Sequence, residues 1–291
     1  MRLSLKYAKY LHKNTLTIAP KRAILFASQA GKQKSNGKKV APMKKTFALI
    51  LIFALMLCGT AMAETLTMGS SIDFAPYEYY DDETGEIVGI DVEIAKAVAE
   101  KLGCDLEIVD MQFDSIIAAV VSGKADFGMS GFTITEDRKQ SVDFSMPYTT
   151  AVQSIIVPEG SEITSVDDIF NPDNAYNIGV QIGTTGDLYI TDDIAANGLK
   201  HTVMQYNKAP DAIVALLSGK VDCVIIDDQV ALSFVKGNEG LKTLDTAYAF
   251  EEYAVCFAKE SPIYADFNAA LEELIADGTV QSIIDKYIVA E

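Results

Sequence analysis

The sequence predicts an α/β fold built as two similar lobes that face each other across a cleft. Three observations lead to this prediction. Strand-like and helix-like segments alternate from residue 64 onward, a 12-residue pattern recurs 96 residues later, and the buried strand after each copy ends in polar residues. Alternating strands and helices are typical of parallel sheets with helices on both faces. Ligands of such sheets collect outside the carboxyl ends of the strands, so two facing lobes would enclose one.

The first half of this region begins with an alternating strand and continues with a helix that stops at Gly103. Apolar residues at helical spacing followed by glycine are typical of a helix and its end. The expected elements are strands at Glu64–Gly69, Leu106–Val109 and Ala125–Met129, and helices at Val92–Leu102 and Ser115–Val121.

The second half has the same character, and its helices are also followed by turn residues. Asn197-Gly198 ends one helix, and Asp277-Gly278 interrupts the last helical region. The expected elements are strands at Gln153–Val157 and Asn177–Val180, and helices at Gly186–Ala196 and within Ile263–Tyr287.

The recurring pattern is the strongest sign of two lobes. Residues 115–126 read SIIAAVVSGKAD, and residues 211–222 read DAIVALLSGKVD. Each copy predicts a helix, a Ser-Gly-Lys turn, an aspartate and a buried strand. The first strand reaches Ser130-Gly131 and the second reaches Asp227-Asp228. The two lobes are therefore expected to share one plan and to present polar groups at equivalent strand ends.

The first 63 residues are interpreted as an upstream segment followed by a cleaved signal peptide. They carry 12 Lys or Arg and no acidic residue. Met43-Lys44-Lys45 precedes an apolar run that is short for a membrane span, and Ala61-Met62-Ala63 has the small-x-small pattern of a cleavage site. We take Met43 as the expected true start and Glu64 as the first mature residue. Lipid anchoring at Cys58 is disfavoured because Leu57 precedes it, and a retained anchor or an organelle transit segment is a lesser alternative.

The composition of residues 64–291 excludes several functions. With the leader removed, 12 basic and 41 acidic residues remain, a net charge of −29. Such a surface repels nucleic acid and anionic membranes. Cys104, Cys223 and Cys256 form no paired pattern and are expected to be buried thiols, while His201 has no ligand partner at metal-binding spacing. Neither a disulfide framework, a metal site nor a cofactor is expected.

Arg138 is the only arginine after the leader, and it lies in Thr133-Ile-Thr-Glu-Asp-Arg138 directly after a strand end. Thr135 is suited to cap a helix that begins with two acidic residues. A guanidinium fork beside a helix N-terminus is suited to binding a carboxylate. The alternative is a surface ion pair with Glu136 or Asp143.

Two other segments could complete a binding site. Gln181-Ile-Gly-Thr-Thr-Gly186 lies between a strand and a helix, where it presents backbone N–H groups and hydroxyls or is simply a helix-entry loop. It lacks the residues of a phosphate loop and the glycine spacing of a dinucleotide site. At most one of Asp227 and Asp228 can face the cleft, because adjacent strand residues point to opposite sides. Phe74 and Phe113 could wall an apolar pocket or belong to the core.

Taken in order, these motifs resemble those of bacterial extracellular solute-binding proteins of family 3, which serve amino-acid ABC importers. The resemblance runs from Leu66 to the C-terminus. It is carried by residues 74–77 (FAPY), 89–95 (GIDVEIA), 122–126 (SGKAD), 131–138 (GFTITEDR), 142–145 (VDFS) with 147–148 (PY), 183–185 (GTT) and the strand that ends at Asp228. It implies a periplasmic-binding-protein-like fold of type II, with a sheet flanked by helices in each lobe, a hinge and an interlobe cleft.

The resemblance also implies roles and boundaries. Arg138 should pair with the α-carboxylate of a free L-amino acid, while Thr133, Gly131 and Thr185 bind the ligand backbone. Asp228 should hold the α-ammonium with help from Ser130, and Phe74 and Phe113 should sandwich the side chain; Gln181 and Ser71 complete the expected site. The hinge should cross near residues 148–152 and 251–253, which gives lobes of 64–149 with 253–291 and of 150–252. An exported monomer, periplasmic or at the cell surface, would deliver its ligand to the importer's membrane subunits.

The ligand's side chain remains open at this stage. Position 71 is Ser where family members that prefer cationic or amide ligands often carry Asp, and position 90 is Ile where Phe is common. Cationic, amide, acidic and aromatic amino acids and cystine are all compatible. The alternatives in function are an exported cyclohexadienyl or arogenate dehydratase on the same scaffold, with Asp227 or Glu252 as the acid, or a sensor module that signals through a separate membrane partner.

Overall fold

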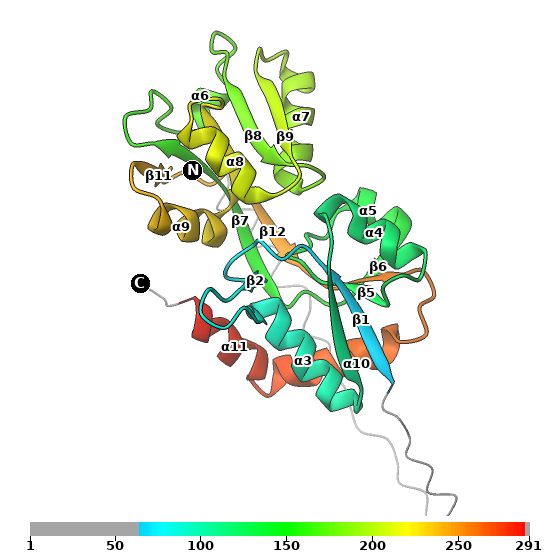
Figure 1. Ribbon diagram of the computed structural model, residues 1–291. Helices are drawn as coiled ribbons and strands as arrows, with labels where there is room; N and C mark the ends of the chain where they lie inside the picture. The colour runs from blue at the N-terminus through cyan, green and yellow to red at the C-terminus, as the bar shows by residue number, and fades with distance from the viewer. Residues whose placement is uncertain (1–63, 289–291) are drawn as a thin grey trace, which may run out of the picture. The chain divides into compact units, whose positions relative to one another are not determined.

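The computed structural model describes residues 64–288, and the predicted leader lies outside this range. These residues form two α/β lobes, each with its own sheet (Figure 1). In the first sheet, β1 lies between β4 and β5 and pairs with both in parallel, while β13 runs antiparallel to β5 and β6. The strand order is β4 (Asp105–Asp110), β1 (Thr65–Ser70), β5 (Phe127–Gly128), β13 (Cys256–Ala258) and β6 (Val142–Phe144).

Helices of the first lobe flank this sheet, and a small hairpin precedes the first of them. They are α3 (Ile90–Leu102), α4 (Phe113–Val121), α5 (Glu136–Ser141), α10 (Tyr264–Ala276) and α11 (Thr279–Tyr287), with the hairpin strands β2 (Tyr79–Tyr80) and β3 (Ile87–Val88). Gly103 ends α3 in the left-handed conformation that favours glycine, as the sequence predicts. The Asp277-Gly278 break that was predicted in the last helical region separates α10 from α11.

The second sheet contains β11 (Leu241–Thr243), β7 (Thr149–Pro158), β10 (Cys223–Asp227), β8 (Asn177–Gln181) and β9 (Thr202–Tyr206) in that order, and β12 (Ala249–Tyr253) also pairs with β7. Its helices are α6 (Val166–Ile169), α7 (Thr185–Asn197), α8 (Ala209–Leu217) and α9 (Asp228–Gly237). The parallel pairs that were predicted are present in both sheets, but each sheet also contains antiparallel pairs, which were not predicted. Strand β7, which carries the chain from the first lobe into the second, runs antiparallel to β10, β11 and β12.

The two copies of the repeated pattern have the same structure. Helices α4 and α8 are followed by turns in which Gly123 and Gly219 have positive φ angles. The aspartate after each turn then holds the neighbouring strand. Asp126 Oδ2 accepts a hydrogen bond from Thr67 N at 2.7 Å, and Asp222 Oδ2 accepts one from Asn177 N at 2.7 Å. The two copies of the repeat therefore have the same structural role, in which the aspartate holds one strand against the next.

The cores of the lobes are apolar and tightly filled. In the first lobe, Phe127 packs against Phe267 with ring centroids 4.8 Å apart, and both side chains are fully buried. In the second, Ile155, Ile178 and Ile225 belong to one buried cluster. Cys223 and Cys256 are buried free thiols and Cys104 is partly buried. Within residues 64–288, no helix combines the length and apolar character that crossing a membrane requires.

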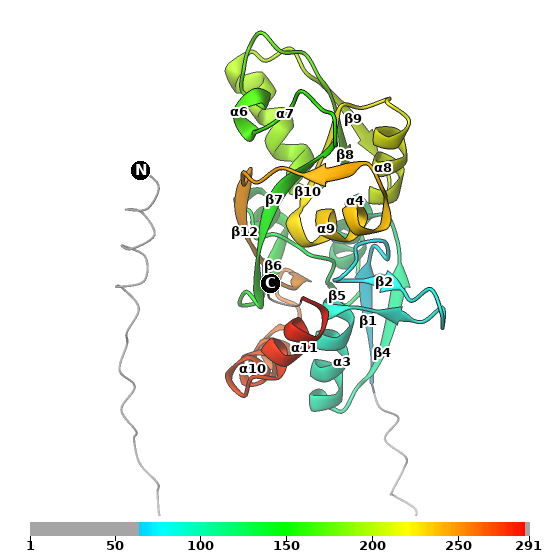
Figure 2. The ribbon, with the colours of Figure 1, turned by 90° about the vertical axis from the view of Figure 1, so that its left-hand side faces the viewer.

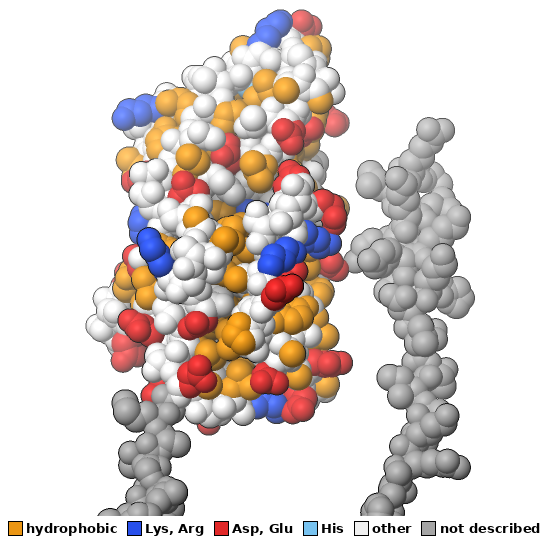
Figure 3. Space-filling model, turned by 90° about the vertical axis from the view of Figure 1, so that its right-hand side faces the viewer, with side chains coloured by type: hydrophobic (Ala, Val, Ile, Leu, Met, Phe, Trp, Pro, Cys, Tyr) orange, Lys and Arg blue, Asp and Glu red, His pale blue; other side chains and the backbone are white. Residues whose placement is uncertain are grey.

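The two lobes are joined where β7 and β12 run side by side (Figures 1 and 2). In this ladder Thr150 faces Glu252 and Thr149 faces Tyr253. The chain therefore leaves the first lobe and returns to it at neighbouring positions. A space-filling view shows acidic side chains spread over one whole face, in keeping with the charge that the sequence predicts (Figure 3).

Candidate functional site

A small cavity lies where polar residues of the two lobes meet. Nine of the ten residues predicted for the site line it, and Asp73, Thr184 and Asp227 complete the lining. The nine are Ser71, Phe74, Phe113, Ser130, Gly131, Thr133, Arg138, Gln181 and Thr185. The strand ends of both sheets contribute, as expected for ligand sites in open α/β sheets. No group of three or more His, Cys, Asp or Glu within the described part of the chain is arranged to hold a metal ion.

Arg138 is the buried cation of this cavity. Thr135 caps the six-residue helix α5, because its hydroxyl accepts a hydrogen bond from Arg138 N at 3.2 Å. The guanidinium lies beside the rings of Phe113 and Phe132, at 5.4 and 5.3 Å from their centroids, and these two rings stack on each other with centroids 4.7 Å apart. The alternative of a surface ion pair does not fit a side chain that is only 7% exposed. Burial lowers the pKa of Arg138 and the nearby Glu251 opposes that shift, but arginine stays protonated in proteins.

The donors of Arg138 are only partly used. Nη1 donates to Thr133 O at 2.9 Å, and Nη2 donates to Gly183 O at 3.1 Å. A guanidinium has five N–H groups, so several remain for another acceptor. Because Gly183 belongs to the second lobe, this side chain also connects the lobes. The arrangement provides a positive, hydrogen-bonding surface suited to a carboxylate.

The second lobe contributes the loop between β8 and α7. Thr184 caps α7 by accepting a hydrogen bond from Asp187 N at 3.4 Å, and Gly183 N donates to Asp187 Oδ2 at 3.0 Å. The loop is therefore a true helix entry, yet Gln181, Thr184 and Thr185 also face the cavity. Thr185 Oγ1 lies 3.5 Å from Thr133 Oγ1 of the first lobe. The helix-entry interpretation is thus confirmed, while binding of an anion by this segment stays a prediction.

The acidic side of the cavity is formed by Asp227, not by the predicted Asp228. Asp227 is the last residue of β10, is 6% exposed and accepts a hydrogen bond from the hydroxyl of Tyr253. Asp228 begins α9, where its Oδ1 accepts a hydrogen bond from Gln229 N at 2.8 Å, and it does not line the cavity. Successive side chains at a strand end point in opposite directions, which leaves only Asp227 facing the first lobe. The structure therefore places Asp227, and not the predicted Asp228, in the cavity lining.

Burial sets the protonation of this carboxyl group. Desolvation, followed by the charge of Glu251, raises the pKa of Asp227 to about 8. Glu251 is itself buried and accepts hydrogen bonds at Oε2 from Thr133 Oγ1 and Gln153 Nε2, both at 3.0 Å. No local motif pointed to Glu251 or Gln153, since the pairing of β12 with β7 is what brings them beside Thr133 and Thr185, which line the cavity. Neutral Asp227 would ionise readily if a cation arrived beside it.

A second network of buried hydrogen bonds holds Ser130 and Gly131 in place. Ser130 Oγ donates to Glu78 Oε1 at 2.6 Å and accepts from Ser71 N at 3.0 Å. Gly131 N donates to Asp91 Oδ2 at 2.8 Å. Burial and the charge of Asp91 raise the pKa of Glu78 well above its usual value, and burial raises the pKa of Asp91 to about 6. The hydroxyl of Ser130 and the N–H of Gly131 are thus occupied by the protein itself.

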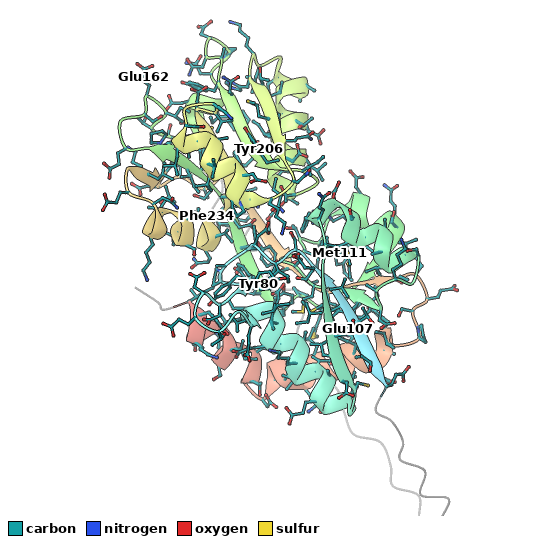
Figure 4. All side chains as sticks on the ribbon, in the orientation of Figure 1. Tyr80, Glu107, Met111, Glu162, Tyr206 and Phe234 are labelled. Atoms are coloured by element: carbon teal, nitrogen blue, oxygen red, sulfur yellow. The ribbon has the colours of Figure 1, made fainter. Side chains whose placement is uncertain are left out.

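The apolar side of the cavity is formed by Phe74 and Phe113, as predicted, and each is 7% exposed. Beside them Ser71 Oγ donates to Asp73 Oδ1 at 3.1 Å and lies 3.5 Å from Gln181 Nε2. Asp73 also borders an outer groove between the lobes, where Tyr80 and Phe234 lie (Figure 4). Sequence reasoning examined position 71 for a carboxylate and missed the one at position 73. The signal was present as an acidic residue in the same loop.

Comparison with known proteins agrees with this geometry. Residues 66–290 match the family described as bacterial extracellular solute-binding proteins, family 3. The chain belongs to this family. It is 34% identical to the arginine-binding extracellular protein ArtP of Bacillus subtilis, across 86% of this chain and all of that protein.

Solved structures of the family have the same type II fold. The substrate-binding protein of an amino-acid ABC transporter superposes with a TM-score of 0.70 at 33% identity, covering 78% of this chain and all of the other. An ancestral arginine-binding protein bound to arginine superposes with a TM-score of 0.71 at 38% identity, covering 78% of this chain and 99% of that one. These relatives are binding proteins and not enzymes.

Proposed function

We propose that this protein captures a free L-α-amino acid in its interlobe cleft and delivers it to the membrane subunits of an ABC importer. The observation that carries the proposal is the presence of a cation and a carboxyl group in one cavity, with Arg138 from the first lobe and Asp227 from the second. An α-amino acid presents a carboxylate and an ammonium a few bonds apart, which complements this pair. Membership in the family and the names of the arginine-binding relatives support it.

Within this site each residue has a proposed role. The free N–H groups of Arg138 receive the α-carboxylate, with the hydroxyls of Thr133 and Thr185 beside it. Asp227 ionises and holds the α-ammonium. Because the Ser130 hydroxyl and the Gly131 N–H already have partners, we assign these two residues to the ammonium through their backbone carbonyl oxygens. Phe74 and Phe113 enclose the side chain.

Ligand binding is coupled to motion of the lobes in this proposal. We divide the chain into one lobe of residues 64–149 and 253–291 and another of 150–252, with the hinge in β7 and β12. A ligand that touches both lobes binds the closed form more tightly and shifts the population toward it. The importer would then recognise that closed form of a monomer.

Export follows from the same proposal. The family consists of extracellular solute-binding proteins, and the basic leader with its small-x-small site would direct this chain out of the cell. Cleavage after Ala63 would leave a strongly acidic protein that stays soluble at high concentration. Whether it remains periplasmic or at the cell surface depends on the envelope of the host.

One observation bears on the dehydratase alternative. Asp227 has a raised pKa in the cavity, which an acid catalyst also requires. Glu252, the other candidate acid, is exposed and lies outside the cavity lining. In our proposal the raised pKa serves binding, because a ligand ammonium stabilises the ionised form. The matched relatives are binding proteins, and a product assay with prephenate and arogenate tests the alternative directly.

The proposal is tested by binding measurements on residues 64–291 after unfolding and refolding to remove bound ligand. Thermal shifts with all common L-amino acids would be followed by calorimetry, starting with arginine. A ligand at 100 times its Kd adds roughly 2.7 kcal/mol, which is a rise of about 5–10 °C in Tm for a protein of this size. Agmatine, which lacks the carboxylate, is the matched control ligand and should give no shift. A protein that binds no amino acid, or that binds agmatine as well as arginine, would contradict the proposal.

A further inference from the structure

Asp73 carries a buried oxygen atom that has no partner. Its Oδ1 accepts a hydrogen bond from Ser71 Oγ, but its Oδ2 is buried without any hydrogen-bond partner among residues 64–288. The side chain is 6% exposed and lines the same cavity as Arg138. An unsatisfied buried acceptor is destabilising unless something else satisfies it. The position of this oxygen therefore indicates that it is kept for a ligand.

The charges around Asp73 favour a cation. Asp110 and Asp211 are the other carboxylates whose charges act on it, and both raise its pKa, as burial does to a larger extent. The nearest positive group is Lys208 of the second lobe. Its Nζ lies 4.0 Å from Asp73 Oδ2 and 3.7 Å from Asp110 Oδ2. Lys208 thus lies near two carboxylates, a third acts on Asp73, and the region keeps a net negative charge.

Lys208 can compete with a ligand cation for Asp73, but it does not hold this carboxylate firmly. Its side chain is 40% exposed, and its distance to Asp73 is at the limit of an ion pair. A lysine of this kind is held weakly, because exposed ion pairs contribute little. It can turn toward Asp110 or toward solvent when a cation approaches Asp73 from inside the cavity. The neighbouring rings of Phe74 and Phe113 also favour a cation, through the negative faces of their π systems.

We infer that Asp73 selects amino acids whose side chain ends in a cation, and that Lys208 from the opposite lobe weakens this selection by competing for the same carboxylate. The inference rests on the proposed function, since it names the class of ligand for the same cleft. It assigns the charge selection to position 73, in the loop where Ser71 provides no charge. It also makes the second lobe a participant in specificity, although the carboxylate belongs to the first lobe.

The test compares arginine with citrulline, which has nearly the same shape and no charge on its side chain. Calorimetry on the wild-type protein should show a clear preference for arginine. Asp73→Asn should weaken arginine binding by at least about 10-fold and citrulline binding by less than about 3-fold. Lys208→Gln should strengthen arginine binding a few-fold and leave citrulline unchanged. Asp105→Asn, an exposed change of the same charge in the first lobe, is the control and should alter neither.

The possible results separate the role of Asp73 from the proposed capture of amino acids. Equal losses for both ligands in Asp73→Asn, or a wild-type protein that prefers citrulline, would overturn the role of Asp73 while amino-acid capture stands. Failure of the wild-type protein to bind any amino acid would instead overturn the proposed function. If Asp73→Asn does not fold, Lys208→Gln still decides, because it changes a partly exposed side chain. An unchanged or reduced preference for arginine in that variant would contradict the competition.

Discussion

Arg138 Nη2 donates a hydrogen bond to the carbonyl oxygen of Gly183, 3.1 Å away in the opposite lobe. Arg138 is also the only arginine between residues 64 and 291, and it lines the cavity beside the rings of Phe113 and Phe132. This side chain therefore connects the lobes, and in our proposal it also binds the ligand carboxylate. A lysine could supply the charge but not several fixed donors in one plane.

Substitutions at Arg138 should show how much this side chain contributes to ligand binding. Arg138→Ala is expected to weaken amino-acid binding by about 100-fold or more, because the ligand carboxylate is left unpaired in a buried site. Arg138→Lys should lose at least about 10-fold, since the fork geometry is lost while the charge remains. Calorimetry with arginine measures both effects. Lys139→Ala is the control, because Lys139 only pairs with the exposed Glu136, and it should bind normally.

The two adjacent aspartates offer a matched pair of variants. Asp227→Asn should weaken binding by about 10-fold or more, because the ligand ammonium loses its counter-charge in the cavity. Asp228→Asn removes the same charge one residue away and should change affinity little. It should lower Tm slightly, because the first turn of α9 loses a negative charge, while the amide oxygen of the new side chain can still accept from Gln229 N. A larger binding loss in Asp228→Asn than in Asp227→Asn would contradict our placement of the ammonium.

Binding should also depend on pH through Asp227. Its pKa is raised from 3.8 to about 8 in the ligand-free protein, so at pH 7 most molecules carry the neutral acid. A bound ammonium favours the ionised form, so binding at pH 7 should release a proton. Calorimetry at pH 7 in buffers of different ionisation enthalpy measures this release. Asp227→Asn should release fewer protons on binding, and an unchanged value would argue against ionisation of Asp227.

The same shift has a consequence for stability without ligand. A carboxyl whose pKa is raised on folding contributes stability that is complete below pH 3.8 and is lost as pH rises through about 8. Relative to wild type, Asp227→Asn should therefore gain stability as pH increases over this range. Urea unfolding at several pH values compares the two proteins. A stability difference that does not change with pH would show that Asp227 is ionised in the folded protein.

Packing beneath the cavity can be tested at Gly128 in β5. A Cβ atom there would lie 2.6 Å from Cys256 Sγ and 2.7 Å from Ile116 Cγ2. Gly128→Ala should destabilise the protein by about 1–3 kcal/mol through overpacking. Adding Cys256→Ala should restore part of the loss, because one of the two clashes disappears. Gly237→Ala in α9 is the control: nothing lies near its new methyl group, and it should be neutral or stabilising.

Local patterns predicted much of this molecule. The glycine after α3, the cap at Thr135 and the repeat around Asp126 and Asp222 are all determined within a few residues of chain, and the structure confirms them. The residues grouped by the family motifs also come together in one cavity. Features that depend on distant pairing were harder to predict. Glu251 reaches the site only because β12 pairs with β7, and no pattern around it indicates this.

Two errors have a similar origin. Only parallel pairing was predicted, because the alternation of strands and helices carries no information about the antiparallel pairs that β7 and β13 form. The choice between Asp227 and Asp228 depended on which side of β10 faces the first lobe. Strand alternation shows that only one of them can face that lobe, but it does not show which one. Both were settled by the arrangement of the sheets and not by composition.

The ladder between β7 and β12 places residue 150 directly opposite residue 252. The whole segment between them is thus an insertion whose two ends meet. A chimera that exchanges this segment for that of a relative would need only two junctions, both within one pair of neighbouring strands. Arg138 and Asp73 would stay with the recipient, whereas Asp227 and Lys208 would come from the donor. Such exchanges would separate what each half of the cleft contributes to ligand choice, within a single folded chain.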